Sequence, residues 1–369
     1  MTNEEPHDDS SSVASAFPDL GNGSETTTGA SEEETHAPVI LDPAKRDAQV
    51  RADLIGLYAR LHQGRLEAGD VLHTTDVDDI DLPWVVGSAE YLRRIYDQGT
   101  DLQPDVVVFG KLTMEDGTIL DIGAHWGYSA VAMRQSGTNC EILSFEPMEF
   151  NWPSLAEFKM LDNGGYDYVM CALTDEPREI RLYSPAVNGR VFSGLNSADG
   201  VSFTEEQVEH VVSRLDIVIP PSDRYHVNLL ETTVKAYRLD DMTLAEFTHI
   251  DLSKIAAMKI DVEGFEIHVL KGAERTIDRD RPFVMIEEGN RAAEVAAFFR
   301  DRNYCYAERD GQQVIPVSGT TDAVNGYWIP MERVLQYIEI GIVRLPDDLS
   351  ILDRDWLDAL TPPHTHESG

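Results

Sequence analysis

Short apolar runs alternate with amphipathic segments from about residue 101 to about residue 310 of the chain. Continuous apolar runs of about four to eight residues are typical of buried strands, whereas apolar residues spaced three and four apart predict helices. Strands that alternate with helices predict an α/β fold with a mostly parallel, doubly wound sheet covered by helices on both faces. The predicted strands are 106–109, 118–122, 141–146, 167–171, 178–184, 234–238, 257–262, 283–288 and 327–329, and the predicted helices are 43–66, 88–96, 128–135, 151–161, 205–215, 242–247, 266–277 and 292–302.

Composition and periodicity divide the chain into four parts. Residues 1–38 are rich in Ser, Thr, Asp and Glu, which predicts a disordered acidic tail. The helical segments of 39–100 predict an N-terminal helical cap, which precedes the α/β core of 101–310. Within that core, Gly and Pro break the pattern over 185–232, and so long an irregular connection predicts a lid or a substrate-binding insertion. Residues 311–369 hold a last predicted strand and a tail.

The formal net charge of −36 argues against nucleic acid or an anionic membrane as a partner. It is consistent with a high-salt cytoplasm, or with an acidic tail combined with neutral drift in the rest of the chain. The sequence shows no secretory signal and no apolar run of membrane-spanning length, so we expect a cytoplasmic protein.

The three cysteines are widely spaced and form no C-x-x-C pair, so no disulfide framework or zinc site is readable. Cys140 and Cys171 lie at the edges of predicted strands, and we expect them to pack in the core. Carboxylates are plentiful, but no His/Cys pair has the spacing of metal ligands, and we predict no metal site.

The loop at 119–129 is the most informative local pattern. An apolar run ends at Asp121, Gly123 and Gly127 follow, and a helix-prone segment begins at Tyr128. A glycine turn between a buried strand and a helix lets the backbone approach a ligand closely. The spacing fits neither G-x-G-x-x-G nor G-x-x-x-x-G-K-[ST], the patterns that bind pyrophosphate or triphosphate. The loop therefore favours a nucleoside ligand without phosphates, of which S-adenosylmethionine is the commonest.

A second acid, Glu146, ends the next apolar run. In doubly wound folds an Asp or Glu about 20 residues beyond the first turn accepts hydrogen bonds from ribose hydroxyls. A carboxylate suits this role because it only accepts hydrogen bonds, and its two oxygens can hold a vicinal diol. The alternative role of Glu146 is to cap the helix that we expect to begin near Phe150.

The sequence contains DIGAHWG at 121–127, FEP at 145–147, ALTD at 172–175 and KIDVEG at 259–264. Together these four short motifs resemble the FkbM family of S-adenosylmethionine-dependent methyltransferases. The resemblance runs from about residue 110 to about residue 303, and its last motif is the most specific. It implies a Rossmann-like class I methyltransferase fold and methyl transfer to a hydroxyl group, with a small molecule or a glycan as acceptor. The family leaves the identity of the acceptor open.

Two other functions remain alternatives. A nicotinamide-dependent oxidoreductase has a related fold, but this chain lacks the third glycine and the pyrophosphate loop of such enzymes. A non-catalytic partner subunit with the same fold is the second alternative, although a scaffold needs none of the carboxylates in these motifs. The sequence supports no prediction of oligomeric state.

The candidate catalytic residues lie in the KIDVEG motif. An alcohol has a high pKa, so a positioned carboxylate is useful to take its proton. Asp261 is our leading candidate for this base and Glu263 is the second, while the alternative role of Asp261 is to cap the following helix. Lys259 stands in an apolar strand, where an unpaired ammonium is costly, so we favour an ion pair with Asp261 or Glu287 over direct catalysis. Asp261 with Glu287 is also the pair that would hold a Mg²⁺ ion, should one assist the reaction.

The remaining candidates surround the expected cofactor. Asp121 is expected to accept from the methionyl amino group, and backbone N–H groups at the helix start to donate to its carboxylate. His125 either acts as a base or packs beside the methionine moiety. The turn after the strand at 167–171 is expected against the adenine. The full predicted cofactor-binding set is Asp121, Gly123, Ala124, Gly127, Glu146, Ala172 and Leu173.

Overall fold

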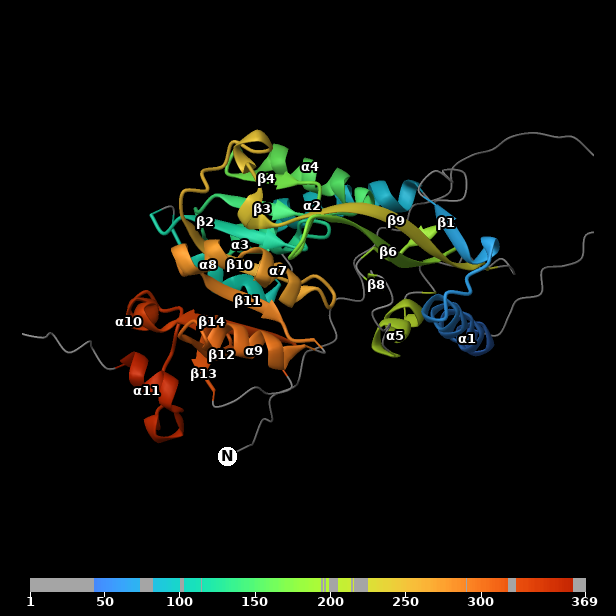
Figure 1. The fold of residues 1–369 in the computed structure, drawn as a ribbon. Helices are drawn as coiled ribbons and strands as arrows, with labels where there is room; N and C mark the ends of the chain where they lie inside the picture. The colour runs from blue at the N-terminus through green and yellow to red at the C-terminus, as the bar shows by residue number, and fades with distance from the viewer. Residues whose placement is uncertain are drawn as a thin grey trace, which may run out of the picture.

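A computed structural model describes the parts of the chain on which the following account is based. Figure 1 shows a body built on a large sheet and an arm formed by a long β-ribbon, with helices near its outer end. The acidic tail predicted for residues 1–38 lies outside the described residues. These are 43–73, 82–99, 103–113, 115–193, 195, 197–198, 205–213, 215, 225–289, 291–317 and 323–360.

The body contains an eight-stranded sheet with the order β13-β12-β14-β11-β10-β2-β3-β4. Strands β4, β3, β2, β10 and β11 run parallel, and β14 runs antiparallel to both of its neighbours, β11 and β12. The predicted α/β fold with a mostly parallel, doubly wound sheet is therefore confirmed. The strands are β2 (Thr118–Ile122), β3 (Ile142–Phe145), β4 (Tyr166–Val169), β10 (Ile255–Ile260), β11 (Phe283–Glu287), β12 (Tyr304–Asp310), β13 (Gln313–Pro316) and β14 (Asn325–Pro330).

Helices cover both faces of this sheet (Figure 1), which buries its strands on two sides. In β2, Ile119 packs in the core under α2, α3, α4, η4, α10 and α11, while Leu120 packs in the core under α7, α8 and α9. Burying such a side chain contributes about 1.5–3 kcal/mol. Cys140 and Cys171 pack in these two cores, as predicted. The helices are α2 (Leu82–Gln98), η4 (Pro104–Lys111), α3 (Tyr128–Gln135), α4 (Trp152–Leu161), α7 (Glu266–Gly272), α8 (Glu274–Asp280), α9 (Ala292–Arg300), α10 (Val334–Glu339) and α11 (Arg354–Leu360).

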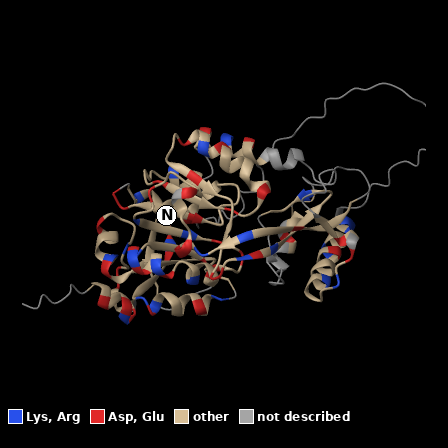
Figure 2. Cartoon of the chain, turned by 45° about the horizontal axis from the view of Figure 1, so that its top comes forward, with Lys and Arg blue, Asp and Glu red and all other residues tan. Residues whose placement is uncertain are grey.

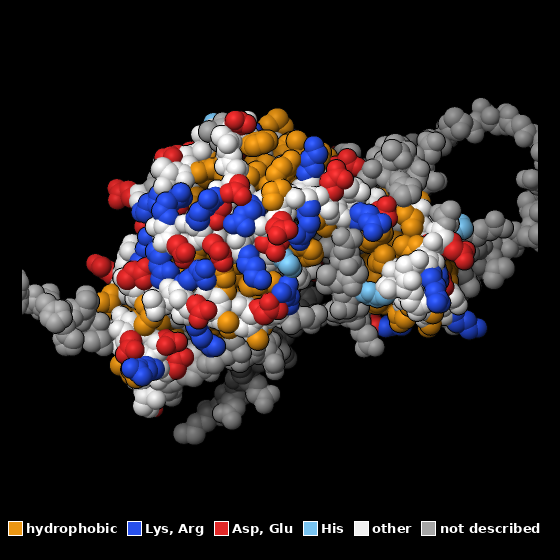
Figure 3. All heavy atoms as spheres, viewed as in Figure 1, with side chains coloured by type: hydrophobic (Ala, Val, Ile, Leu, Met, Phe, Trp, Pro, Cys, Tyr) orange, Lys and Arg blue, Asp and Glu red, His pale blue; other side chains and the backbone are white. Residues whose placement is uncertain are grey.

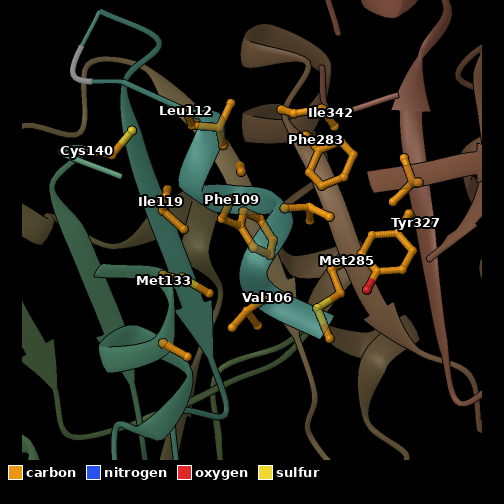
Figure 4. Close-up of a cluster of buried hydrophobic side chains, with 14 of the residues drawn as sticks. Val106, Phe109, Leu112, Ile119, Met133, Cys140, Phe283, Met285, Tyr327 and Ile342 are labelled. Carbon is orange, nitrogen blue, oxygen red and sulfur yellow. The ribbon is translucent and has the colours of Figure 1, made fainter. Parts of the chain in front are cut away.

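The strand predicted for 106–109 is wrong, because this segment belongs to the 3-10 helix η4. Its apolar side chains enter the first core, where the ring of Phe109 meets the ring of Phe283 edge-on with centroids 5.6 Å apart (Figure 4). A short apolar run fits a buried strand and a buried helix equally well. Pro104 at the start of the segment favours the helix, since proline is preferred in a first helical turn.

Other local predictions differ from the structure in extent. The helix predicted for 242–247 is only the 3-10 turn η7 (Leu244–Glu246), and the helix predicted for 266–277 is divided at Ala273 into α7 and α8. Strands β12 and β13 were not predicted. They pair with each other, and β13 lies beyond residue 310, where we predicted that the core ends. Because β14 lies between β11 and β12, the body sheet continues beyond the boundary that we predicted at that residue.

The strands predicted for 178–184 and 234–238 are real, but they do not join the parallel sheet. They belong to β6 (Arg178–Val187) and β9 (Val227–Tyr237), which pair antiparallel from one end of β6 to the other. The segment 185–232 therefore leaves the body along β6 and returns along β9. The short strands β1 (Val71–His73), β5 (Ala172–Leu173), β7 (Arg190–Val191) and β8 (Ser197–Ala198) complete this second sheet.

The two helices of the predicted N-terminal cap lie in different places. Helix α1 (Pro43–His62) packs with α5 (Glu205–Ser213) and the ribbon in a small apolar cluster of the arm (Figure 1). Helix α2 packs instead against the body, where Leu92 and Ile95 enter the first core. The shorter 3-10 turns are η2 (Ala68–Asp70), η5 (Glu149–Asn151), η6 (Leu239–Asp241), η8 (Met331–Arg333) and η9 (Leu349–Ile351).

Acidic and basic residues are distributed over both the body and the arm (Figure 2). On the face seen in Figure 3 the two signs are interspersed over the body, with apolar side chains between them. Residues 1–38 contain nine acidic residues and no Lys or Arg, so most of the net charge of −36 belongs to the rest of the chain. The tail alone therefore does not account for the acidity.

Candidate active site

The strand order of the body sheet reverses beside β2, which pairs with β3 on one side and β10 on the other. In open α/β sheets, ligands bind at such a switch point, outside the carboxyl ends of the strands. A pocket with about 890 Å³ of empty space opens there. Its lining residues are Ile122, Gly123, His125, Phe145, Glu146, Pro147, Cys171, Ala172, Leu173, Ile180, Leu182, Ser193, Asp261, Val262, Glu263 and Phe265.

Gly123 lies where the end of β2 meets the end of β10, at the edge of this pocket. Its φ is +79°, in the left-handed region that glycine adopts most easily. A Cβ at this position would lie 1.8 Å from the carbonyl oxygen of Asp261, so no other residue fits without movement of the backbone. The turn after β2 is thus packed directly against the residue that follows β10. Gly127, with φ +82°, ends the same turn, and a Cβ there would lie 2.9 Å from the Leu155 side chain.

Lys259 is the buried cation beneath this turn. Its Nζ donates a 2.8 Å hydrogen bond to the carbonyl oxygen of Gly123 and lies 3.3 Å from Asp261 and 3.5 Å from Asp121. Burial acts to lower the pKa of Lys259, but attraction by Asp261 and Asp121 outweighs it and leaves the pKa above its usual value. Lys259 therefore stays protonated, which makes it an ion-pair partner rather than a base. Asp121, Lys259 and Asp261 lie together beneath the turn, and we call this group the floor of the pocket, although only Asp261 lines it directly.

Asp121 is fully buried and does not line the pocket. Its Oδ2 accepts hydrogen bonds from Ser129 at 2.7 Å and Ser144 at 3.2 Å, while its Oδ1 has no hydrogen-bond partner among the described residues and faces Lys259. A direct contact with a ligand amino group, as predicted from the sequence, would need this carboxylate at the surface. In the structure it instead secures Lys259 and the helix that follows the turn.

Glu146 lines the pocket at the end of β3 and has only 4 % of its surface exposed. Its Oε1 accepts from the Met148 amide at 2.8 Å and from Asn151 Nδ2 at 3.1 Å, and its Oε2 accepts from the His125 amide at 2.8 Å. Burial raises the pKa of Glu146 to about 7, although these donors oppose the shift. A carboxylate has about four acceptor sites, so one on Oε2 is left once the three bonds from described residues are counted. Helix α4 has Asn151, not Glu146, at its N-cap.

Asp261 and Glu263 both line the pocket, on the turn between β10 and α7. The side chain of Asp261 is 33 % exposed and is held from below by Lys259. Asp261 does not cap α7, whose N-cap is Phe265. Glu263 has a φ of +53°, an unusual conformation for a residue with a side chain, and one that is often found where function requires it.

Further carboxyl groups stand next to this turn. Burial, followed by repulsion from Asp261, Glu263 and Glu266, raises the pKa of Glu287 at the end of β11 to about 9. Glu287 is therefore protonated at neutral pH, when it can donate a hydrogen bond but carries no charge. Glu266 is buried, and its Oε1 accepts from the amides of Val262 and Gly264, which fixes the turn that carries Glu263.

The opposite wall of the pocket comes from the second sheet. Ile180 and Leu182 project from the same face of β6 into an apolar cluster with Met148, and Phe265 packs against it. We call Ile180 and Leu182 the roof of the pocket. Next to it lie Cys171, Ala172 and Leu173, and burial raises the pKa of the Cys171 thiol to about 12, so this thiol is not a nucleophile.

The structure separates the predicted site residues into two groups. Six of them line the pocket, and the other four are buried and do not. Sequence reasoning did not identify the roof, although the alternation of charged and apolar residues over 179–182 is a signal for one covered face. It also did not identify Ser193, which has no local signal and reaches the pocket from the insertion. The lining residues are Gly123, Glu146, Ala172, Leu173, Asp261 and Glu263, and the buried ones are Asp121, Ala124, Gly127 and Lys259.

Within the described ranges, no group of three or more His, Cys, Asp or Glu residues is arranged to hold a metal ion. In the same part of the chain, no helix has both the length and the apolar character that crossing a bilayer requires.

The family model for the methyltransferase FkbM domain matches residues 121–306 of this sequence. No curated protein matches the sequence. A solved structure of methyltransferase FkbM from Methylobacillus flagellatus KT is 14 % identical with a TM-score of 0.35, and the match covers 76 % of this chain and 60 % of that one. Precorrin-6y C5,15-methyltransferase from Geobacter metallireducens GS-15 is 11 % identical with a TM-score of 0.29, over 61 % of this chain and 85 % of that one.

Proposed function

We propose that this chain, which belongs to the FkbM methyltransferase family, is an S-adenosylmethionine-dependent O-methyltransferase that acts on a hydroxyl group of a small molecule or a glycan. Membership of the family implies methyltransferase activity. The observation that carries the proposal is the meeting of Glu146, Asp261 and Glu263 around the turn at Gly123, in one pocket at the switch point.

The chemistry of the pocket fits this cofactor. Its described lining contains three carboxylates and no Lys or Arg. A phosphate-bearing dinucleotide is usually bound by cationic side chains or by a glycine-rich backbone cradle. S-adenosylmethionine has no phosphate and carries a positive sulfonium, so an acidic lining supports it over a nicotinamide cofactor.

We assign the cofactor-binding roles by position. Glu146 would accept a ribose hydroxyl on Oε2, where an acceptor site remains. Ala172 and Leu173 would pack against the adenine, and the backbone of the turn at Gly123 would face the methionyl group. Asp121 would act from beneath through Lys259, which replaces the direct contact predicted from the sequence.

Asp261 is the proposed catalytic base. When bound, the cofactor supplies an activated methyl group, and the protein must orient the acceptor and take its proton. Asp261 is exposed to the pocket and would accept the hydroxyl proton on a carboxylate oxygen. Lys259 holds that carboxylate in place at 3.3 Å and, being protonated, cannot itself accept the proton. Glu263, from the same turn, would orient the acceptor.

Calorimetric titration tests the cofactor assignment without knowledge of the acceptor. Purified protein should bind S-adenosylmethionine with a dissociation constant in the micromolar range and should not bind NAD under the same conditions. Binding of NAD without binding of S-adenosylmethionine would overturn the proposal. A screen of hydroxylated sugars and small molecules with methyl-labelled cofactor should then identify an acceptor to which label is transferred.

A further inference from the structure

A series of hydrogen-bonded side chains, which we call the hydrogen-bond chain, connects Glu146, the proposed ribose acceptor, to the insertion at 185–232. Asn151, which is fully buried, donates from Nδ2 to Glu146 Oε1 at 3.1 Å. Its Oδ1 accepts a 2.8 Å hydrogen bond from the hydroxyl of Ser193, and the oxygen of Ser193 lies 3.1 Å from Nε2 of His125. Ser193 is itself buried, with 6 % of its surface exposed. Asn151, Ser193 and Glu146 are therefore largely shielded from water, whereas His125 is part-buried.

The chemistry of each group fixes the direction of the chain. Above the raised pKa of Glu146, its ionised carboxylate only accepts, so Asn151 must direct its NH₂ group to Glu146 and its oxygen to Ser193. The single hydroxyl proton of Ser193 is then used on Asn151. Nε2 of His125 must therefore be the donor to Ser193, which places the imidazole proton on Nε2.

The chain closes on itself at Glu146. The backbone amide of His125 donates to Glu146 Oε2 at 2.8 Å, so both ends of the chain meet on the two oxygens of one carboxylate. His125 has a left-handed φ of +49°, and its ring stacks on Trp126 with centroids 4.8 Å apart. The residue is thus held by its backbone and by its ring, in the turn that follows β2.

We infer that Asn151 and Ser193 are positioning residues that act through Glu146 and His125, and that they couple the insertion at 185–232 to the cofactor-binding turn. The inference rests on the proposed function, because it assigns them to the cofactor side of the pocket. Ser193 and His125 line the pocket from turns that follow strands of different sheets. When these hydrogen bonds are intact, the Glu146 carboxylate and the turn after β2 are already in place before S-adenosylmethionine binds. This reduces the entropy that is lost on binding. A movement of the insertion that displaces Ser193 would remove this organisation.

The test combines binding with a direct measurement of the histidine. Ser193→Ala removes one link, and loss of one buried hydrogen bond predicts a dissociation constant for S-adenosylmethionine about fivefold higher. In ¹⁵N-histidine NMR spectra of the cofactor-free protein, the wild type should show His125 protonated on Nε2, and Ser193→Ala should show a mixture of tautomers. Ser184→Ala, which also shortens a buried serine of the second sheet but lies outside the pocket lining, is the matched control and should change neither quantity.

The outcomes separate the two proposals. If the wild type does not bind S-adenosylmethionine, the proposed function fails, while the NMR spectrum of the wild type still tests the chain. If the wild type binds the cofactor and Ser193→Ala leaves affinity and tautomer unchanged, the inference is overturned and the proposed function stands. Weaker binding with an unchanged tautomer also overturns it. Should Ser193→Ala fail to fold, the wild-type spectrum still tests the inference. A wild-type His125 protonated on Nδ1 would by itself contradict the proposed hydrogen-bond chain.

Discussion

The floor and the roof of the pocket are built by opposite means. In the floor, Lys259 is buried in the parallel sheet between Asp121, which is also buried, and Asp261, which follows β10 and is partly exposed to the pocket. In the roof, Ile180 and Leu182 present apolar side chains from one face of an antiparallel ribbon. Buried charges interact strongly and are costly when unpaired, whereas apolar contacts are non-directional and roughly additive in area. Substitutions in the floor should therefore remove activity or folding, and substitutions in the roof should weaken binding by degrees.

Removal of the proposed base should have the largest effect. Asp261→Asn keeps the size of the side chain but cannot take the acceptor proton, so turnover should fall about 10²- to 10⁴-fold, the usual contribution of a general base. Its affinity for S-adenosylmethionine should stay near that of the wild type. Turnover is measured with methyl-labelled cofactor on the first acceptor that the wild type methylates. Asp347→Asn, an exposed acid outside the pocket, is the control. Near-normal turnover of Asp261→Asn would exclude it as the base.

Loss of the buried cation should primarily affect folding. Lys259→Met leaves Asp121 without its buried counter-charge, and breaking a buried pair in this way costs about 3–5 kcal/mol. Urea denaturation of wild type and variant measures the change in the free energy of unfolding. Adding Asp121→Asn to Lys259→Met should recover part of the loss, because it removes the unpaired charge. Equal stability of Lys259→Met and wild type would mean that the floor is not an electrostatic unit.

Glu146 is the proposed contact of the pocket with the ribose of the cofactor. Its replacement should have an intermediate effect, and on cofactor binding rather than on turnover. Glu146→Ala removes the proposed ribose acceptor and the partner of the His125 amide, so the dissociation constant for S-adenosylmethionine should rise about tenfold or more. Titration calorimetry measures the change, and circular dichroism establishes whether the variant folds. A folded Glu146→Ala protein with unchanged affinity would remove Glu146 from the ribose role.

Because the pKa of Glu146 is raised, both the stability of the protein and its affinity for S-adenosylmethionine should depend on pH. The pKa is about 7 in the folded protein, above the ordinary value of 4.5, so the folded state retains a proton that the unfolded state has lost. Without cofactor, the contribution of this group to stability is therefore full below about pH 4.5 and is lost as the pH rises to about 7. Affinity for S-adenosylmethionine should change in the opposite sense and increase as the pH rises through 7. Glu146→Gln should abolish both dependences.

The body could be predicted from the sequence in much more detail than the arm. Buried parallel strands such as 118–122 appear as continuous apolar runs, and the acids that end them, Asp121 and Glu146, were identified because strand ends converge at one edge of a sheet. The strands at 178–184 and 234–238 were also recognised, but their pairing is between residues about 50 positions apart, and no local pattern specifies a partner at that distance. Ser193 is a single polar residue in the insertion, and its role depends entirely on that long-range pairing.

The roof should show the smallest effect. Leu182→Ala removes apolar contact from the pocket but leaves every charge in the floor in place, so affinity for S-adenosylmethionine should fall only about two- to fivefold, as expected for the loss of a few buried methyl and methylene contacts at a partly open site. Val234→Ala is the matched control, because Val234 packs in the same apolar cluster on β9 but does not line the pocket. Both variants should lower the midpoint of urea denaturation, and only Leu182→Ala should weaken binding. A loss of affinity in Leu182→Ala as large as that in Glu146→Ala would mean that the roof orders the ligand as strongly as the polar side does, and the contrast between the two walls would not hold.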